Sequence, residues 1–415
     1  MPVHIRRPRS AVGLAAAAVA AALSTPAWAD PAPAYRDLLA RLGETPSAAE
    51  AGALIDAAEA RVRQARMRPN PSIGLEIENA FGSGPFSGLD NAETTLSLSQ
   101  ELELWGRRRA RVGVAQAEAE AIGLRGQLAL VEGAGRLALA YAEAEAAERR
   151  ADLAQEALDL TLADARAALI LVEQGREPLL RGIQAESESA AARAALDEAI
   201  AERVAALARL TVVAQLPTPV TGIPASLLDQ PPIQGAPHSE PLGVQVADAE
   251  RETADRRIDA ARIQARPDVT ASLGVRRFAA EDATALVVGL SVPLPLFDRN
   301  RGNIDAARAD LRAADARLAA IRQDATADRL AAVARLGASA SRVSATDAGV
   351  IAAEEAYRLS RIGFEAGRIS QLELRGTRAA LITARTAALD ARLARVRAEI
   401  DLARLQGRAP FGEAR

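Results

Sequence analysis

Side chains that could carry chemistry are few in this 415-residue chain. Cysteine is absent, and the two histidines are His4 and His238. This composition excludes thiol catalysis, disulfides and cysteine-ligated metals. A lone histidine in a proline-rich segment is typical of a bystander, because a metal site needs clustered ligands. We also find no convergent His, Ser and Asp set and no phosphate-binding loop. The sequence therefore predicts no enzyme, no metal ligand and no cofactor.

Three carboxylates stand out by their spacing. Glu76, Glu78 and Glu93 alternate with apolar residues in segments 71–79 and 91–104. An alternation with a period of two is typical of strands, and it places the three carboxylates on the water-facing side. An acidic surface of this kind favours cations. Because any water-facing strand surface needs polar residues, the sequence leaves both interpretations open.

A very long helix follows these strands. From about Gly106 to Glu173 the chain is rich in Ala, Leu, Arg and Glu, which predicts a helix of roughly 100 Å at about 1.5 Å per residue. Gly175 then provides a left-handed cap, and Pro178 cannot continue the same helix. A shorter helix is expected before the strands at 47–68, with Ser47 as its N-cap.

The same order of elements occurs twice. At one constant offset Trp105 aligns with Phe297, and Gly175 aligns with Gly367. The second copy predicts strands at about 267–296 and a helical hairpin at about 302–406. The expected organisation is a signal peptide at 1–29, a first repeat at 30–215 with a strand hairpin at about 71–104 and a helical hairpin at about 106–210, a proline-rich linker at 216–243, a second repeat at 244–407, and a tail at 408–415.

The N-terminus has the features of a secretory signal. Three arginines precede the apolar run Ala11–Leu23, which is too short to span a membrane, and small residues then offer a cleavage site between Ala29 and Asp30. Removing three arginines and no acid changes the formal charge from −3 to −6, which argues against nucleic acid as a partner. Because the chain has no cysteine, a lipid-anchored N-terminus is not expected.

Any membrane crossing is expected to use strands, because no later segment has about eighteen or more consecutive apolar residues. Two hairpins give four strands, and a four-stranded sheet has two open edges that lipid does not tolerate. Single-chain barrels begin at about eight strands. Several copies must therefore pool their strands. The simplest assembly is a membrane barrel continued by a long helical tube.

The junctions between strands and helices resemble the TolC family of outer-membrane efflux channels. The stretches that carry the resemblance are NPSIGLEIENAFGSG (70–84), LSLSQELELWGRRRARV (96–112) and VPLPLFDRNRGNIDAARA (292–309). They are most similar to the CzcC-type branch, the outer-membrane partners of heavy-metal efflux pumps. The resemblance implies a mainly α fold with transmembrane β-structure. This fold would be a homotrimer with a twelve-stranded barrel in the outer membrane of a Gram-negative bacterium and an α-helical tunnel in the periplasm.

The resemblance also implies partners and roles. A periplasmic adaptor and an inner-membrane RND pump would deliver substrate, and the channel would be a passive exit duct for divalent heavy-metal cations. The adaptor would contact a periplasmic tip formed by the two helical turns, which comprise Gly175, Arg176, Glu177, Pro178, Gly367, Arg368, Ile369 and Ser370. Glu76, Glu78 and Glu93 would line the barrel lumen.

A gate would lie beside the tip. In the family an acidic residue stands six positions past each tip glycine. Here the second repeat has Glu373, but the first has Arg181, and Phe364 replaces a tyrosine. We therefore expect an Arg181–Glu373 ion pair in the closed state, with two solvated charges as the alternative interpretation.

Other classes remain open from the sequence. Related channels export drugs and other small molecules, so a multidrug efflux channel is the first alternative. A periplasmic adaptor also has a long helical hairpin, but it has one hairpin with flanking β-domains rather than two strand–helix repeats. A coiled-coil scaffold would not need the paired period-two hairpins.

Overall fold

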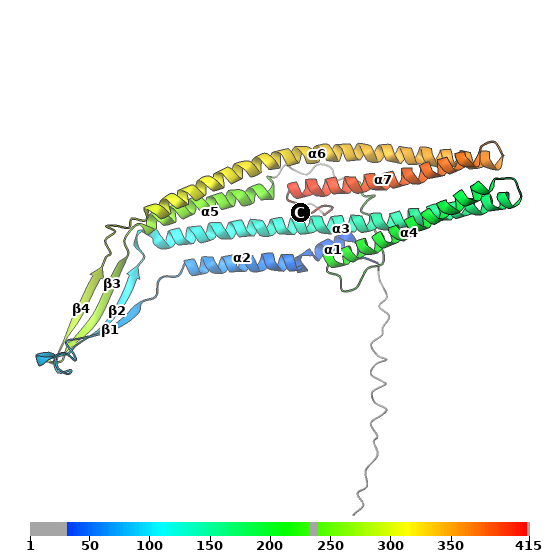
Figure 1. Ribbon diagram of the computed structural model, residues 1–415. Coiled ribbons are helices and arrows are strands. Elements are labelled where there is room, and N and C mark those ends of the chain that lie inside the picture. Colours follow the sequence, from blue (N-terminus) through cyan, green and yellow to red (C-terminus); the bar gives the residue numbers. More distant parts are fainter. Residues whose placement is uncertain (1–30, 232–239, 413–415) are drawn as a thin grey trace, which may run out of the picture. The chain divides into compact units, whose positions relative to one another are not determined.

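A computed structural model describes residues 31–231 and 240–412. The expected cleavage site between Ala29 and Asp30, and His238, lie outside these residues. The helices are α1 (Tyr35–Ala40), α2 (Pro46–Ala65), α3 (Arg107–Glu173), α4 (Leu179–Val213), α5 (Leu242–Gln264), α6 (Arg301–Glu365) and α7 (Gln371–Leu405) (Figure 1). The strands are β1 (Ser72–Glu78), β2 (Glu93–Leu102), β3 (Val269–Phe278) and β4 (Ala283–Ser291). Short 3-10 turns occupy Leu42–Glu44, Gly84–Phe86 and Leu104–Gly106.

The mainly helical fold is confirmed, with two strand hairpins that are each followed by a long helical hairpin. In the described parts of the chain, no helix combines the length and the apolar character that a membrane span needs. One local prediction is wrong, because Thr45 rather than Ser47 is the N-cap of α2. The Thr45 side chain accepts a hydrogen bond from the amide of Ala48 (3.4 Å), and Pro46 occupies the first turn. The fixed φ of Pro46 starts the helix there.

The four strands form one antiparallel sheet in the order β1-β2-β3-β4 (Figure 1). β2 and β3 come from different repeats and pair over ten residues, from Glu93 opposite Phe278 to Leu102 opposite Val269. The register of the three strand pairs places apolar residues in common rows across the sheet; one row is Leu75, Leu96, Val275 and Leu286. The faces predicted from the period-two pattern therefore continue across both repeats.

The apolar face of this sheet is exposed. Ile73 is 77% and Val288 is 74% exposed. Further large apolar side chains of this face are also exposed, namely Leu75, Ile77, Leu96, Leu98, Leu273, Val275, Leu286 and Leu290. On the opposite, polar face, Thr95 and Gly274 are buried. A sheet that folds in water has the reverse arrangement, because burying apolar surface is favourable. An apolar environment outside the chain must therefore cover this face.

The chain divides into two compact units. One unit contains the sheet, α2, α5, the parts of α3 and α6 up to Gly135 and Ala338, and residues 398–412. Here α5 packs on α6 through Ile258, Ala261 and Ala307. On α3, a Cβ added to Gly126 would lie 3.2 Å from the Ile55 side chain of α2. Each short helix of this unit thus packs along a long helix.

The other unit contains α1, α4, most of α7 and the remaining parts of α3 and α6. Small residues form one of its contacts, between Ala165 and Ala168 of α3 and Ala185 of α4. Tyr141 of α3 is fully buried and lies edge-on to Tyr35, with the ring centroids 5.9 Å apart. Burial raises the pKa of Tyr141 to about 12, so the phenol stays neutral.

A buried carboxylate in this second unit fixes the segment that follows α4. Glu145 of α3 accepts hydrogen bonds from the backbone amides of Leu227 (2.7 Å) and Leu228 (3.1 Å). It also pairs with Arg149 at 2.6 Å. Arg149 in turn binds Asp229 at 2.5 Å, and this hydrogen bond lowers the pKa of Asp229. The segment 226–229 is therefore held to α3 by charge-assisted hydrogen bonds.

Candidate functional site

The turn that ends α3 is a Schellman motif. The amide of Arg176 donates to the carbonyl oxygen of Leu171 (2.9 Å), and the amide of Gly175 donates to that of Val172 (2.9 Å). Gly175 has φ +68°, the left-handed conformation that this motif requires. A side chain at this position would strain the backbone, which explains the glycine.

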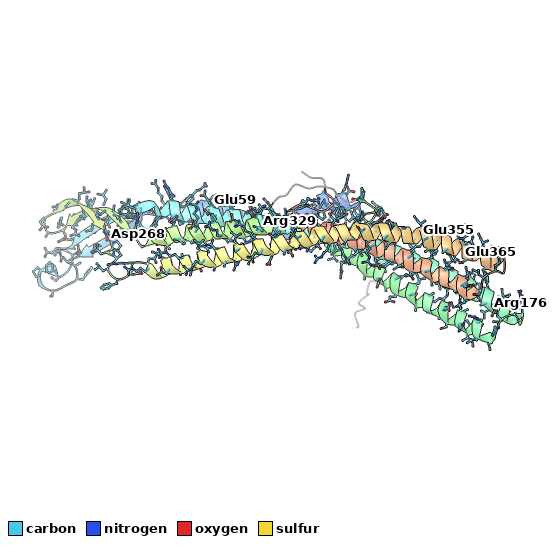
Figure 2. The ribbon with its side chains drawn as sticks, turned by 90° about the horizontal axis from the view of Figure 1, so that it is seen from above. Glu59, Arg176, Asp268, Arg329, Glu355 and Glu365 are labelled. Carbon is cyan, nitrogen blue, oxygen red and sulfur yellow. The ribbon has the colours of Figure 1, made fainter. Side chains whose placement is uncertain are left out.

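The turn that ends α6 has the same geometry. Gly367 has φ +69°, and its amide donates to the carbonyl oxygen of Phe364 (2.9 Å). The amide of Arg368 donates to the carbonyl oxygen of Gly363 (2.8 Å). Both turns lie at the same end of their unit (Figure 1), and Figure 2 shows Arg176 and Glu365 near that end. Gly175 and Gly367, which align in the sequence repeat, therefore have the same role: each adopts the left-handed conformation that ends a long helix.

The residues that follow the two turns differ. Ser370 and Glu373 form a reciprocal capping box at the start of α7. The amide of Ser370 donates to Glu373 Oε2 (2.8 Å), and the amide of Glu373 donates to Ser370 Oγ (3.3 Å). α4 instead begins after Pro178 without a side-chain cap. The pattern Ser-x-x-Glu in the sequence is a known signal for such a box.

The two charges expected at the gate have partners on their own helical turns. Arg181 lies 4.0 Å from Glu177, and Glu373 is engaged by Ser370. Within the described residues of one chain the structure does not bring Arg181 and Glu373 together. Phe364 is half-buried at the end of α6. The Arg181–Glu373 pair stays a prediction.

Exposed leucines lie directly after both turns. Leu179 and Leu180 follow the first turn, and Leu372 follows the second; all three are more than half exposed. Exposed leucines beside arginines at a helical end form a surface that suits a protein partner.

Arginines of α7 connect the helices behind the turns. Arg378, Arg385 and Arg392 are spaced seven residues apart, so they lie along one face of the helix. Arg378 pairs with Asp164 of α3, and Arg392 pairs with Asp347 of α6 at 2.9 Å.

Arg385 and Arg375 complete these contacts. Arg385 contacts Glu156 of α3 (2.7 Å) and Glu354 of α6 (2.9 Å). Burial tends to lower the pKa of Arg385, but its hydrogen bonds to both glutamates outweigh burial and raise it. Arg375 pairs with Glu188 of α4 at 2.6 Å. α7 is thus tied to each of the other three long helices of the unit, which the sequence analysis did not foresee.

The polar face of the sheet brings together two of the three predicted lumen carboxylates. Glu78 and Glu93 lie directly opposite each other on β1 and β2. The guanidinium of Arg276, which comes from β3, contacts both carboxylates. Its Nη2 is 2.9 Å from Glu78 Oε2, its Nη1 donates to Glu93 Oε2 (2.9 Å), and its Nε donates to Thr95 Oγ1 (2.8 Å). Glu76, on the same face, is exposed. The sequence analysis missed Arg276, although the alternation of β3 places it on this face.

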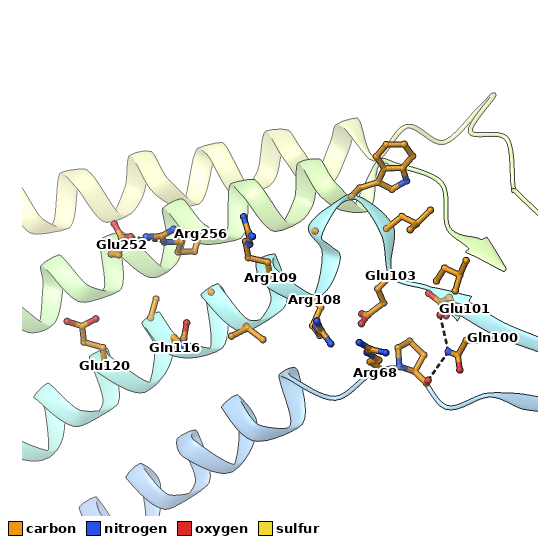
Figure 3. A pocket seen from close by; sticks show the side chains of 18 residues that line it. Arg68, Gln100, Glu101, Glu103, Arg108, Arg109, Gln116, Glu120, Glu252 and Arg256 are labelled. Atoms are coloured by element: carbon orange, nitrogen blue, oxygen red, sulfur yellow. Dashed lines mark hydrogen bonds and ion pairs between the residues drawn. The ribbon is translucent and has the colours of Figure 1, made fainter. Parts of the chain in front are cut away.

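A cleft of about 1100 Å³ lies where the strands meet the helices (Figure 3). Four arginines and four glutamates are among its lining residues: Arg68, Arg108, Arg109, Arg256, Glu101, Glu103, Glu120 and Glu252. In Figure 3, Gln100 donates to the carbonyl oxygens of Pro69 (3.0 Å) and Glu101 (2.9 Å). The charges balance, and across the described chain no group of three or more His, Asp or Glu is arranged to hold a metal ion. We therefore assign no ligand to this cleft.

The two aligned aromatic residues lie at the strand–helix junctions. Trp105 has φ +62° in the turn between β2 and α3, and the Arg266 guanidinium lies 5.6 Å from the centroid of its ring. Phe297, between β4 and α6, is 97% exposed. Arg107 pairs with Asp268 at 2.6 Å and links the start of α3 to the start of β3. Charged contacts therefore brace the junction between β2 and α3, and both aromatic rings remain accessible.

Comparison with known proteins supports the resemblance seen in the sequence. NccC of Alcaligenes xylosoxydans xylosoxydans, a nickel-cobalt-cadmium resistance protein, is 38% identical over 280 residues, which is 66% of this chain and 64% of NccC. CnrC of Cupriavidus metallidurans (strain ATCC 43123 / DSM 2839 / NBRC 102507 / CH34), a nickel and cobalt resistance protein, is 39% identical over 280 residues, which is 66% of this chain and 67% of CnrC. The match thus spans slightly less than two thirds of the length of NccC.

The fold is shared with solved outer-membrane channels. A crystal structure of CusC, described as showing changes that accompany transmembrane channel formation, superposes with a TM-score of 0.76 at 17% identity, covering 90% of this chain and 92% of CusC. A family model described as outer membrane efflux protein matches residues 40–214 and 241–408. The chain therefore belongs to the outer membrane efflux protein family, as its strand–helix junctions predicted.

Proposed function

We propose that this chain is the outer-membrane channel subunit of a tripartite efflux system. Three copies form a trimer, and their strands close a twelve-stranded barrel that continues as a helical tunnel in the periplasm. A signal peptide that is cleaved between Ala29 and Asp30 directs the chain through the inner membrane. The channel is passive, and energy comes from an inner-membrane RND pump.

The observation that carries this proposal is the exposed apolar face of the sheet. Its leucines, isoleucines and valines match a lipid surface, and its polar face matches a water-filled lumen. β1 and β4 are the edge strands of the four-stranded sheet. Lipid does not tolerate open edges, so β4 of one copy must pair with β1 of the next. Trp105 and Phe297 then lie where aromatic residues commonly meet the membrane–water interface.

The helical turns are the proposed contact for a periplasmic adaptor. Gly175, Arg176, Glu177 and Pro178 form one turn, and Gly367, Arg368, Ile369 and Ser370 form the other. Their shared Schellman geometry and the exposed leucines beside them present two similar surfaces at one end of the unit. Behind the turns, the α7 arginines hold the two helical hairpins together, which supports a closed arrangement of the tip.

The proposed substrates are divalent heavy-metal cations. NccC and CnrC are named for resistance to nickel, cobalt and, for NccC, cadmium. Glu76, Glu78 and Glu93 would give the lumen an acidic character that suits cations. Selectivity among metals would lie in the pump, because the described residues offer no metal site.

A deletion strain tests the proposal. Loss of the gene should lower tolerance to nickel, cobalt, cadmium or zinc, and the intact chain should restore it. Antibiotic sensitivity is measured in parallel, and a change in antibiotic tolerance alone would favour a multidrug channel. The purified protein should be a detergent-extracted trimer from the outer membrane that conducts ions in a planar bilayer. A soluble periplasmic protein without conductance would contradict the channel.

A further inference from the structure

Arg276 is positioned to control the charge of one end of the proposed duct. It lies on the polar face of β3, close to the strand end that faces the loops 79–92 and 279–282 rather than the helices (Figure 1). Its guanidinium contacts Glu78 of β1 and both Glu93 and Thr95 of β2. All three guanidinium nitrogens are therefore engaged, so the positive charge is fixed in place.

The carboxylates on this part of the face are only partly neutralised. Glu93 also accepts a hydrogen bond from Asn79 (3.1 Å). Glu76 lies on β1 in the same row as Thr95 of β2 and Arg276 of β3. Among the described residues, Arg276 forms its ion pairs with Glu78 and Glu93 and not with Glu76. Three carboxylates against one guanidinium leave a formal charge of −2 for each chain. Without Arg276 the charge would be −3.

We propose that Arg276 limits the cation preference of the exit end of the duct. In three symmetry-related copies these four residues contribute a formal charge of −6 to one mouth, and rings of carboxylates attract cations into a pore. The mouth remains negative enough to attract a cation, and the positive charge of Arg276 weakens cation binding enough for the cation to leave. Its second effect is structural, because its fork joins the hairpin of one repeat to the hairpin of the other. This inference rests on the proposed channel function, which makes the polar face a lumen.

The chain offers a matched control. Arg277 is the next residue, but it lies on the apolar face and pairs with the exposed Asp282 at 3.2 Å. Replacing Arg277 therefore removes the same charge from the same height of the sheet on the opposite side. If lumen charge sets selectivity, only Arg276 should affect it.

The test is the reversal potential of the purified channel in a planar bilayer under a potassium chloride gradient. Arg276→Gln should shift the reversal potential toward the potassium equilibrium potential, and Glu76→Gln should shift it the opposite way. Arg276→Lys, which keeps the charge, and Arg277→Gln should match the wild type. Equal reversal potentials for Arg276→Gln and Arg277→Gln would overturn the inference. A wild-type protein that does not conduct would instead contradict the proposed function.

A second pair of variants covers the case in which Arg276→Gln does not assemble. Glu93→Gln changes the summed formal charge of residues 76, 78, 93 and 276 to −1 per chain. Adding Arg276→Gln returns this sum to −2, and the lost carboxylate at position 93 relieves repulsion. The double variant should therefore be more cation-selective than Glu93→Gln alone and close to the wild type. Identical reversal potentials for these two variants would also overturn the inference.

Discussion

Arg378 of α7 and Asp164 of α3 form an ion pair in which the arginine side chain is only 11% exposed. Arg378 also donates to the carbonyl oxygen of Leu160 (3.3 Å). α7 follows the second helical turn and α3 precedes the first, so this pair joins the two hairpins. Such a contact resists separation of the hairpins at the proposed tip.

We expect Arg378→Ala to lower the stability of the helical unit by about 2 kcal/mol, because it leaves a partly buried carboxylate unpaired. The measurement is thermal unfolding followed by circular dichroism. The control is Arg358→Ala, since Arg358 pairs with Glu355 on the exposed surface of α6, where solvent screens the pair and its loss should cost far less stability. If the pair also holds the tip closed, Arg378→Ala should increase antibiotic leak into cells. Equal stability of the two variants would contradict a structural role for the Arg378–Asp164 pair.

Replacing Gly367 tests the tip. A valine at φ +69° is strained by about 1–2 kcal/mol, which should distort the turn that the adaptor is proposed to contact. We expect Gly367→Val to abolish metal tolerance while trimers still reach the outer membrane, as judged by fractionation. Gly349→Val, inside α6 and with open space around the added side chain, is the control and should retain tolerance. Full tolerance in the Gly367 variant would argue against the tip as a docking surface.

Glu373 has two possible roles that one substitution separates. A glutamine can replace glutamate in a capping box, so Glu373→Gln should keep the start of α7 helical, whereas Glu373→Ala should cost about 1 kcal/mol. If the predicted Arg181–Glu373 pair closes the tip, Glu373→Gln should increase drug leak, and a charge reversal at Arg181 should increase it as well. Single-channel conductance and drug leak at wild-type values would contradict the pair and leave Glu373 with its capping role alone.

The Arg149–Asp229 contact predicts a pH dependence of stability. The hydrogen bond from Arg149 lowers the pKa of Asp229 below its usual value. A carboxyl with a lowered folded-state pKa contributes stability above its unfolded pKa of about 3.9, and this contribution is lost as the pH falls through the folded value. Asp229→Asn should therefore be less stable than the wild type at pH 7 and melt at a lower temperature. The loss in free energy of unfolding should be less than about 1 kcal/mol, because the Asp229 side chain is half exposed. The difference between the two melting temperatures should begin to shrink below about pH 4 and disappear once the pH falls below the folded-state pKa; a constant difference down to pH 2 would contradict this assignment.

Local patterns predict much of this fold, because helix caps and strand faces are set by residues close together in the sequence. The glycines of the two turns and the apolar faces of the strands are of this kind. The role of Arg276 was not predicted from the sequence, because it depends on contacts between distant segments. Its contacts with Glu78 and Glu93 depend on the register between β2 and β3, which distant segments of the chain determine.

The helices behind the two turns show the same difference between local and long-range contacts. The spacing of Arg378, Arg385 and Arg392 is visible in the sequence, but their acidic partners are on other helices and only the packing identifies them. The capping box of Ser370 and Glu373 has a local signature that our sequence analysis did not use, because its two members are three residues apart. A pair of charges across two turns, such as Arg181 and Glu373, has no comparable local signature.

The unpaired edges of β1 and β4 have a consequence for the life of the chain before assembly. A single copy in the periplasm would carry an exposed apolar sheet with two free hydrogen-bonding edges, which is a template for aggregation. If the proposed trimer forms, biogenesis must shield the sheet until the three copies meet at the membrane. We expect the yield of functional channel to depend more on periplasmic chaperones and on the rate of synthesis than on the stability of the helices.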